Sequence, residues 1–232
     1  MNKTNRNLLA LLIANVPAFS LLVWYRLTHE EAFTISDMLI YPLLVGGGLS
    51  LLILWLNKVL LKSTFKKTFN PARESVSSDL VMAVMLTLLF FFLYWVEKIT
   101  VYKWFPQNNV ASAELIELIQ KIAYNPALMA LWMGPVVWIG VAVFEELSRA
   151  FFLKCMWNIS QNKFWQILVV IISTLMTMAV HLHQGIAGMI SVGVMGLLLA
   201  LYFYQFKRIL PLILAHGFYD AIQLFVLVYQ YR

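Results

Sequence analysis

Apolar residues fall in long runs along this chain, and most polar residues lie between the runs. About 20 consecutive apolar residues are enough to cross a bilayer as a helix. The pattern therefore predicts an all-α fold, a polytopic transmembrane helix bundle with short interfacial amphipathic helices. We expect about seven spans, near residues 8–25, 38–56, 80–97, 128–156, 165–183, 186–206 and 209–229.

Two connecting segments have patterns of their own. Apolar residues recur at helical spacing between positions 115 and 122, with Glu117 and Lys121 on other faces, which predicts a short amphipathic helix at the outer surface. The segment from Lys58 to Phe69 mixes apolar residues with four lysines, which is typical of a cytoplasmic interface.

Glycines mark two of the predicted spans. Gly46, Gly47 and Gly48 fall in the middle of the second span, where they favour a bend or a close approach of another helix. Gly193 and Gly196 contribute to a small-residue side of the sixth span, which favours tight helix packing.

Composition agrees with the membrane assignment. Hydrophobic residues make up 62% of the 232 residues and charged residues 12%, whereas soluble domains are about half apolar and a quarter charged. The net charge of +6 does not predict a nucleic-acid partner, because the basic residues lie in loops between spans. The single cysteine, Cys155, excludes an intramolecular disulfide and a cysteine-rich metal site.

The basic residues also predict an orientation. Eleven lysines and arginines fall on one side of the predicted spans and five on the other, with Arg149 inside the membrane. Cytoplasmic loops carry the excess of positive charge in membrane proteins. We therefore expect a multi-pass protein of the cell membrane with a cytoplasmic N-terminus and an outer C-terminus.

A cluster of three charged residues interrupts the apolar stretch of the fourth span. Glu145, Glu146 and Arg149 lie between Leu131 and Trp157. Charged groups at membrane depth are costly and mark functional sites by default. On a helix Arg149 can reach either carboxylate, and the bland interpretation is a self-neutralising ion pair. Arg149 can neutralise only one of the two carboxylates, however, and the other is suited to general acid–base chemistry.

Histidines occupy two later spans. His216 and Asp220 are four residues apart and share one helical face, although such a pair often only orients the ring. His181 and His183 are two apart and point to different sides, and we interpret His183 as a packing residue. The helical rise places Glu145, His181 and His216 at depths that differ by about 12 Å at most, within reach of helix tilt.

Together these residues resemble a known family. Glu145-Glu146-Leu-Ser-Arg149, His181-Leu-His-Gln-Gly185 and His216-Gly-Phe-Tyr-Asp220 are similar to the EExxxR, FxxxH and HxxxN or HxxxD motifs of the CAAX-protease and bacteriocin-processing (CPBP, or Abi) family of intramembrane proteases. The resemblance implies a CPBP/Abi-like catalytic helix bundle over residues 131–232. Residues 1–130 would add N-terminal spans and interfacial helices to one integrated membrane domain.

The resemblance implies a role for each motif residue. Glu145 together with His181 would activate a water that attacks the scissile carbonyl of a peptide bond. His216 and Asp220 would form the oxyanion site, while Glu146 and Arg149 would hold the first motif in shape. The expected partners are the lipid bilayer and a peptide or lipid-modified protein substrate, entering from the cytoplasmic leaflet.

Two positions depart from the family pattern. Thr177 stands where the second motif has phenylalanine, which changes packing more than chemistry. Asp220 stands where asparagine is commoner, and an ionised aspartate would repel an oxyanion. We favour a role for Asp220 in orienting His216; a protonated Asp220 or a different mechanism is the alternative.

Alternatives remain for the metal and for the function. His181, His216 and a glutamate match a two-histidine, one-carboxylate zinc set, but an HExxH helix is absent and a glutamate-dependent scheme needs no ion. No cofactor is firmly predicted, and zinc is the alternative. The competing functions are a non-catalytic membrane protein, acting in bacteriocin immunity or as a receptor or scaffold, and a small transporter or proton relay.

Overall fold

The structure is a computed structural model, and it describes residues 1–28, 41–71, 75–105, 113–181 and 184–232, without the side chains of 17–28, 41, 113–115 and 231. These residues form helices and connecting turns and no β-strand, which confirms the all-α prediction. The elements are α1 (Lys3–Thr28), η1 (Tyr41–Gly46), α3 (Gly47–Val59), α4 (Phe65–Phe69), α5 (Val76–Ile99), α6 (Val101–Trp104), α7 (Ala113–Ala123), α8 (Pro126–Leu131), η3 (Trp132–Val143), α9 (Phe144–Trp157), α10 (Lys163–Val180), α11 (Gly185–Phe206) and α12 (Leu210–Tyr231).

Six helical stretches of the described chain are long and apolar enough to cross a membrane. They confirm the second to seventh predicted spans, with ends that differ by a few residues. The stretch predicted as the first span is helical within α1 but is not among the six, so its crossing stays a prediction. The six stretches are Pro42–Val59, Val76–Trp104, Pro126–Trp157, Lys163–Val180, Gly185–Phe206 and Leu210–Gln230.

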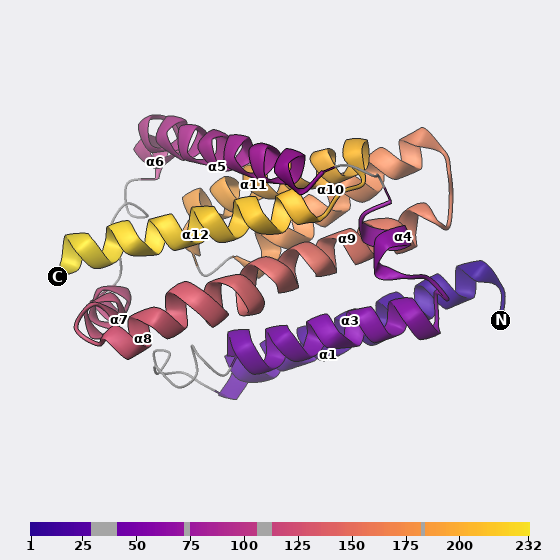
Figure 1. Cartoon of the computed structure of the whole chain (residues 1–232), viewed down its shortest axis with the longest axis horizontal. Coiled ribbons are helices and arrows are strands. Elements are labelled where there is room, and N and C mark those ends of the chain that lie inside the picture. The colour runs from indigo at the N-terminus through magenta and orange to yellow at the C-terminus, as the bar shows by residue number, and fades with distance from the viewer. Residues whose placement is uncertain (29–40, 72–74, 106–112, 182–183) are drawn as a thin grey trace.

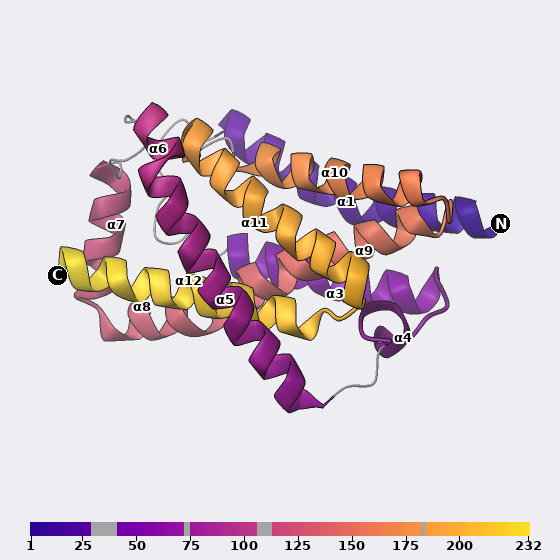
Figure 2. The ribbon, with the colours of Figure 1, turned by 90° about the horizontal axis from the view of Figure 1, so that it is seen from above.

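The long helices run roughly along one axis of the molecule (Figure 1). Helices α1 and α3 pack on each other and on α9, α10 packs on α11 and α9, and α5 packs along α12, which also contacts η3. The N-terminus and α4 lie at one end of the bundle, and the C-terminus, α6 and α7 lie at the other (Figures 1 and 2). We call the first the N-terminal end and the second the C-terminal end.

Two π-helical segments cross at glycines. Pro42 lies in η1 and Pro135 in η3, and proline lacks the amide hydrogen that the regular helical ladder requires. A Cβ on Gly46 would lie 2.6 Å from the carbonyl oxygen of Gly140, and a Cβ on Gly140 would lie 2.6 Å from Cβ of Pro42. Of the three middle glycines of the second span, Gly46 therefore serves the predicted close backbone packing against η3, whereas a Cβ at Gly48 would meet nothing within 4 Å.

The small-residue side of α11 packs against α10. Gly193 faces the side chain of Met178, and Gly196 faces that of Thr177, whose Cγ2 would be 3.1 Å from a Cβ at position 196. The prediction of tight packing by these glycines is confirmed.

The predicted amphipathic segment is helix α7. Leu118, Ile119 and Ile122 are buried in a small cluster with Val228 of α12, whereas Glu117 and Lys121 form an exposed ion pair. The apolar face is thus covered by the bundle itself, and the helical prediction is confirmed.

Buried polar contacts tie the helices together at the N-terminal end. Asp79, in the first turn of α5, pairs with Arg208 in the connection between α11 and α12, and both side chains are almost completely buried. The next residue, Ile209, donates its backbone N–H to the carbonyl of Phe69 in α4 at 3.0 Å. These contacts fix the start of α12, which carries one side of the site described below.

Gly140→Ala tests the helix crossing. The new methyl group would press on the backbone carbonyl group of Pro42, at 2.7 Å, so we expect a loss of about 1–3 kcal/mol of stability. Gly134→Ala, in the same segment, is the matched control because a Cβ there meets nothing within 4 Å. Thermal unfolding midpoints in mild detergent should fall for Gly140→Ala alone, and equal midpoints for the two variants would contradict the crossing.

Candidate active site

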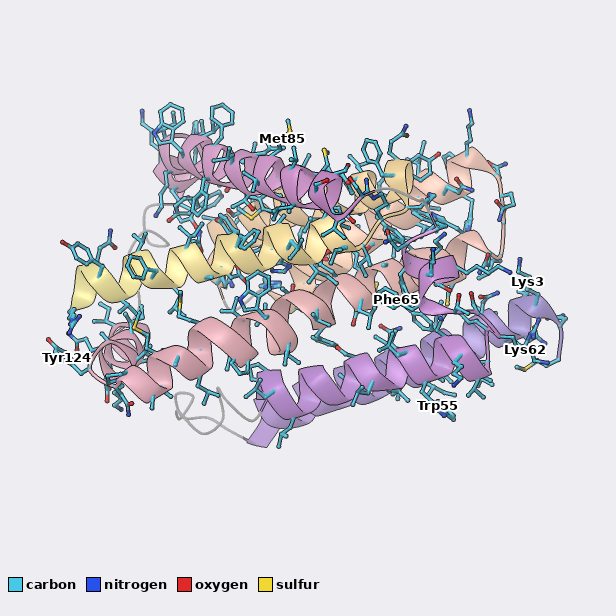
Figure 3. All side chains as sticks on the ribbon, in the orientation of Figure 1. Lys3, Trp55, Lys62, Phe65, Met85 and Tyr124 are labelled. Carbon is cyan, nitrogen blue, oxygen red and sulfur yellow. The ribbon has the colours of Figure 1, made fainter. Side chains whose placement is uncertain are left out.

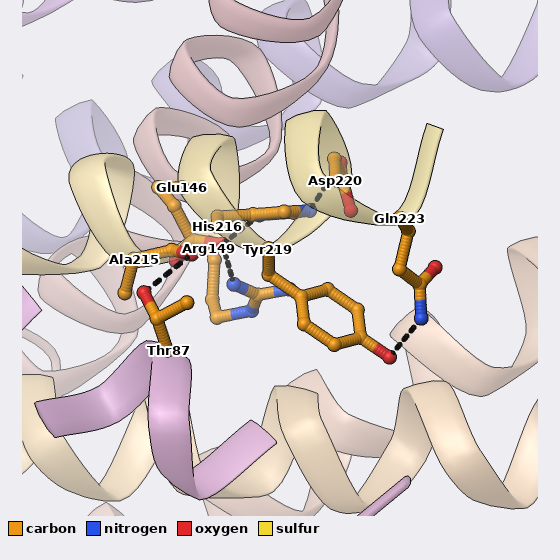
Figure 4. Close-up of polar contacts among 8 residues, drawn as sticks. All are labelled: Thr87, Glu146, Arg149, Ala215, His216, Tyr219, Asp220 and Gln223. Atoms are coloured by element: carbon orange, nitrogen blue, oxygen red, sulfur yellow. Dashed lines mark hydrogen bonds and ion pairs between the residues drawn. The ribbon is translucent and has the colours of Figure 1, made fainter. Parts of the chain in front are cut away.

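Glu146 lies at the centre of the polar contacts. It occupies the first turn of α9, directly after the π-helical segment η3, and its side chain is completely buried. Its Oε1 accepts a hydrogen bond from Arg149, one turn further along, and lies 2.8 Å from Nδ1 of His216 in α12 (Figure 4). A single carboxylate therefore connects the first motif with the third.

The His216 ring contacts a carboxylate on each side. Nδ1 faces Glu146, and Nε2 lies 3.4 Å from Oδ2 of Asp220, one turn along α12. The shorter contact, to Glu146, holds the ring from the buried side, while Asp220 is at 27% side-chain exposure. Both ring nitrogens donate only when the imidazole is doubly protonated. The arrangement thus favours a ring that presents an N–H group toward Asp220.

His181 is held by its own helix. It caps the C-terminus of α10, and its Nδ1 lies 2.8 Å from the carbonyl oxygen of Thr177. A carbonyl oxygen can only accept, so Nδ1 carries the hydrogen and Nε2 is the basic nitrogen of the neutral ring. The side chain of Thr177 packs toward Gly196 and donates to Ser173, which gives the departure from phenylalanine a packing role.

A cavity of about 370 Å³ brings the predicted residues together. Its volume lies at the lower end of the range of ligand sites, roughly 300–1,000 Å³. Five of the six predicted site residues line it, from three different spans, and the sixth, Glu146, lies in contact with two of them. His183 lies outside the described residues. The five are Glu145, Arg149, His181, His216 and Asp220.

The cavity also has polar residues that the motifs do not predict. Tyr219 accepts a hydrogen bond from Gln223 on α12, and Ser191 of α11 donates to Glu97 of α5. Tyr94 and Tyr102 complete this part of the lining. In the sequence, the one sign of this polar part of the cavity is Glu97, a carboxylate at the end of an apolar run. The sequence pattern placed Glu97 only at the boundary of the third span.

The described side chains do not form a zinc site. No three histidine, cysteine, aspartate or glutamate side chains in the described chain are grouped to hold a metal. His216 directs both ring nitrogens at carboxylates, and the Nδ1 of His181 is engaged by a backbone carbonyl. These contacts differ from the two-histidine, one-carboxylate set that the sequence offers as the zinc alternative.

Residues 127–222 match the family model of the type II CAAX prenyl endopeptidase Rce1-like proteins. This region is similar to the CAAX-protease family, and we call it the CAAX-protease segment. It covers less than half of the chain, runs from α8 into α12, and includes all six predicted site residues, which confirms the resemblance of the motifs. Comparisons with curated proteins and with solved structures each found no match.

The CAAX-protease segment supplies the two helices that carry the Glu146 contact, as well as the His181 cap. Helix α5 lies before the segment, yet it contributes Phe90 and Tyr94 to the cavity and packs along α12. The cavity is therefore completed by a part of the chain that the family match does not cover.

The two adjacent glutamates should differ in their effect on stability. Glu146→Gln removes the charge that pairs with buried Arg149, and breaking a buried ion pair costs about 3–5 kcal/mol. Glu145 is partly exposed and lines the cavity, so Glu145→Gln should change stability by about 0.5 kcal/mol or less. The stability of both variants is compared with that of the wild type by their unfolding midpoints in mild detergent. A Glu145→Gln protein as unstable as Glu146→Gln would contradict this division.

Proposed function

We propose that this protein is an intramembrane endopeptidase that hydrolyses a peptide bond of a membrane-associated substrate with a glutamate-activated water. The family match supports a CAAX-type protease in general terms. The observation that carries the finer proposal is the cavity, in whose wall Glu145, His181 and His216 meet from three separate spans.

Glu145 and His181 are the proposed water-activating pair. Glu145 takes a proton from the water, and the water oxygen forms a bond to the carbonyl carbon of the substrate. His181, with Nδ1 held by Thr177, presents Nε2 as an acceptor that orients the same water. When the carbon–nitrogen bond breaks, the proton passes from Glu145 to the leaving nitrogen, which leaves a carboxylic acid and an amine as products.

His216 is the proposed donor to the developing oxyanion. Its Nδ1 is held by Glu146, which is fixed in turn by Arg149, so the ring is positioned before substrate binds. A donor that is already in place stabilises developing charge without reorganisation. Glu146 and Arg149 are positioning residues in this scheme, and neither exchanges a proton with the substrate.

Asp220 contacts the His216 ring, which supports the orienting role that the sequence favours for it. Glu146 makes the shorter contact with the same ring, so in this proposal the two carboxylates share that role. Asp220 lines the cavity beside Nε2. We propose that it keeps the proton on Nε2 and gives up this long contact when the substrate carbonyl approaches.

The position of the cavity bears on the side from which substrate enters. Most basic residues lie at the N-terminal end, where Lys3 and Lys62 are found, whereas Tyr124 marks the opposite end (Figure 3). The cavity reaches toward that opposite end, because Tyr102 and the exposed Gln184 are in its lining. With a cytoplasmic N-terminus, as we propose, substrate enters from the outer half of the membrane rather than from the cytoplasmic leaflet.

Glu145→Gln should abolish cleavage while leaving the protein folded and inserted, because the amide cannot take a proton from water. Membranes that contain wild-type protein should show new peptide N-termini in quantitative proteomics, and membranes with Glu145→Gln should lose them by at least about 100-fold. Glu117→Gln, an exposed change in α7 outside the cavity lining, is the matched control.

Three results would contradict the proposed chemistry. Undiminished cleavage by folded Glu145→Gln removes the role given to that carboxylate. Zinc bound near one ion per chain and lost together with activity defeats the glutamate scheme. A biological effect, such as protection against a bacteriocin, that survives replacement of both Glu145 and His181 favours the non-catalytic alternative.

Cysteine labelling tests the orientation. Cys155 is completely buried, so single cysteines introduced elsewhere can be followed by an impermeant maleimide. In sealed right-side-out vesicles, Lys121→Cys of α7 should react at once, and Lys66→Cys of α4 should react only after the vesicles are opened. The reverse pattern would place the cavity mouth on the cytoplasmic side.

A further inference from the structure

Glu97 is a buried carboxylate that the proposed reaction does not use. It lies near the end of α5, has 5% exposure, and precedes the region that matches the CAAX-protease family. Its Oε2 accepts a hydrogen bond from Ser191, a cavity residue of α11. Its Oε1 is buried and has no hydrogen-bond partner among the described residues. Among the described residues, one oxygen of this carboxylate is therefore left without a partner.

The residues that the structure describes do not supply a cation for Glu97. The neighbouring Lys98 turns to aromatic rings, with Nζ 4.3 Å from the ring centre of Tyr102 and 5.2 Å from that of Tyr94. An ion pair with Glu97 is not found within the described part of the chain. An ionised carboxylate in a membrane span is costly unless it is paired, so a positively charged ligand group would provide the missing partner.

The surroundings of Glu97 favour a cation. Ser191, which donates to the carboxylate, lines the cavity together with Tyr102 and Tyr219. Tyrosine rings attract ammonium groups, as the position of Lys98 over two of them illustrates. The charged residues of the cavity lining add to this preference. Arg149 is already paired with Glu146, and the other charged residues of the lining include the carboxylates Glu145 and Asp220.

We infer that Glu97, Ser191 and the tyrosines form a subsite of the cavity that binds a primary ammonium group, such as the side chain of a substrate lysine. Ser191 holds one carboxylate oxygen, and the other pairs with the ammonium group as it enters between α5 and α11. The subsite lies toward the C-terminal end of the bundle, beyond the polar groups around His216. Its link to a substrate rests on the proposed peptidase function, whereas ammonium binding does not require cleavage.

The test uses n-butylammonium, which reproduces the end of a lysine side chain, and neutral n-butanol as its uncharged counterpart. Dissociation constants are obtained from the shift of the unfolding midpoint of the full chain in mild detergent at constant ionic strength. Wild-type protein should bind n-butylammonium saturably and at least ten-fold more tightly than n-butanol. Glu97→Gln should weaken n-butylammonium binding at least ten-fold and leave n-butanol binding unchanged.

Further variants separate a charge effect from a structural one. Glu97→Asp keeps the charge and should retain the preference for n-butylammonium, and exposed Glu117→Gln should behave as wild type. Glu145→Gln should still bind n-butylammonium, which separates the subsite from catalysis. The inference is overturned if wild-type protein does not distinguish the two probes, if Glu97→Gln keeps the preference, or if Glu145→Gln alone removes it.

Discussion

The buried contact of Glu146 with Arg149 and His216 is the interaction on which the site depends. A carboxylate without water stays charged only if nearby groups replace the lost solvation. Arg149 supplies a charge from the same helix, and His216 supplies a ring nitrogen from α12. Because both contacts meet at one oxygen, they also fix how far apart α9 and α12 lie. Stability and the geometry of the cavity therefore come from the same three side chains.

The irregular helix before this contact has a structural purpose. Segment η3 precedes α9 directly, and its glycine crossing with η1 brings two backbones together at Gly46 and Gly140. Such close packing anchors the first half of the fourth span, which also faces α12 through Trp138 against Gly217. The wider turns of a π-helix change the face that the following residues present. Because successive residues of a helix point in different directions, Glu145 and Glu146 face different surroundings, the cavity and the buried ion pair.

Much of this arrangement could be predicted from the sequence. Long apolar runs predict the spans, and costly polar residues within them predict Glu145, His181 and His216 as site residues. The sequence could not predict which nitrogen of His216 meets which carboxylate, since that depends on the rotation of α12 against α9. The role of Glu97 could not be predicted for a similar reason, because a carboxylate at the end of an apolar run is expected to mark the end of a membrane span. Only the packing of α5 on α12 and α11 shows that it is buried beside the cavity.

The two departures from the family pattern have separate physical accounts. At position 177 the part that matters to His181 is the backbone carbonyl, which any residue supplies, so threonine there leaves the imidazole tautomer unchanged. Its small side chain suits the close approach of Gly196 on α11. At position 220 the side chain itself is in contact with the ring, and aspartate differs from asparagine in having no hydrogen to donate. An ionised Asp220 can only accept from His216, and in that form the donor to an oxyanion at this place has to be the histidine.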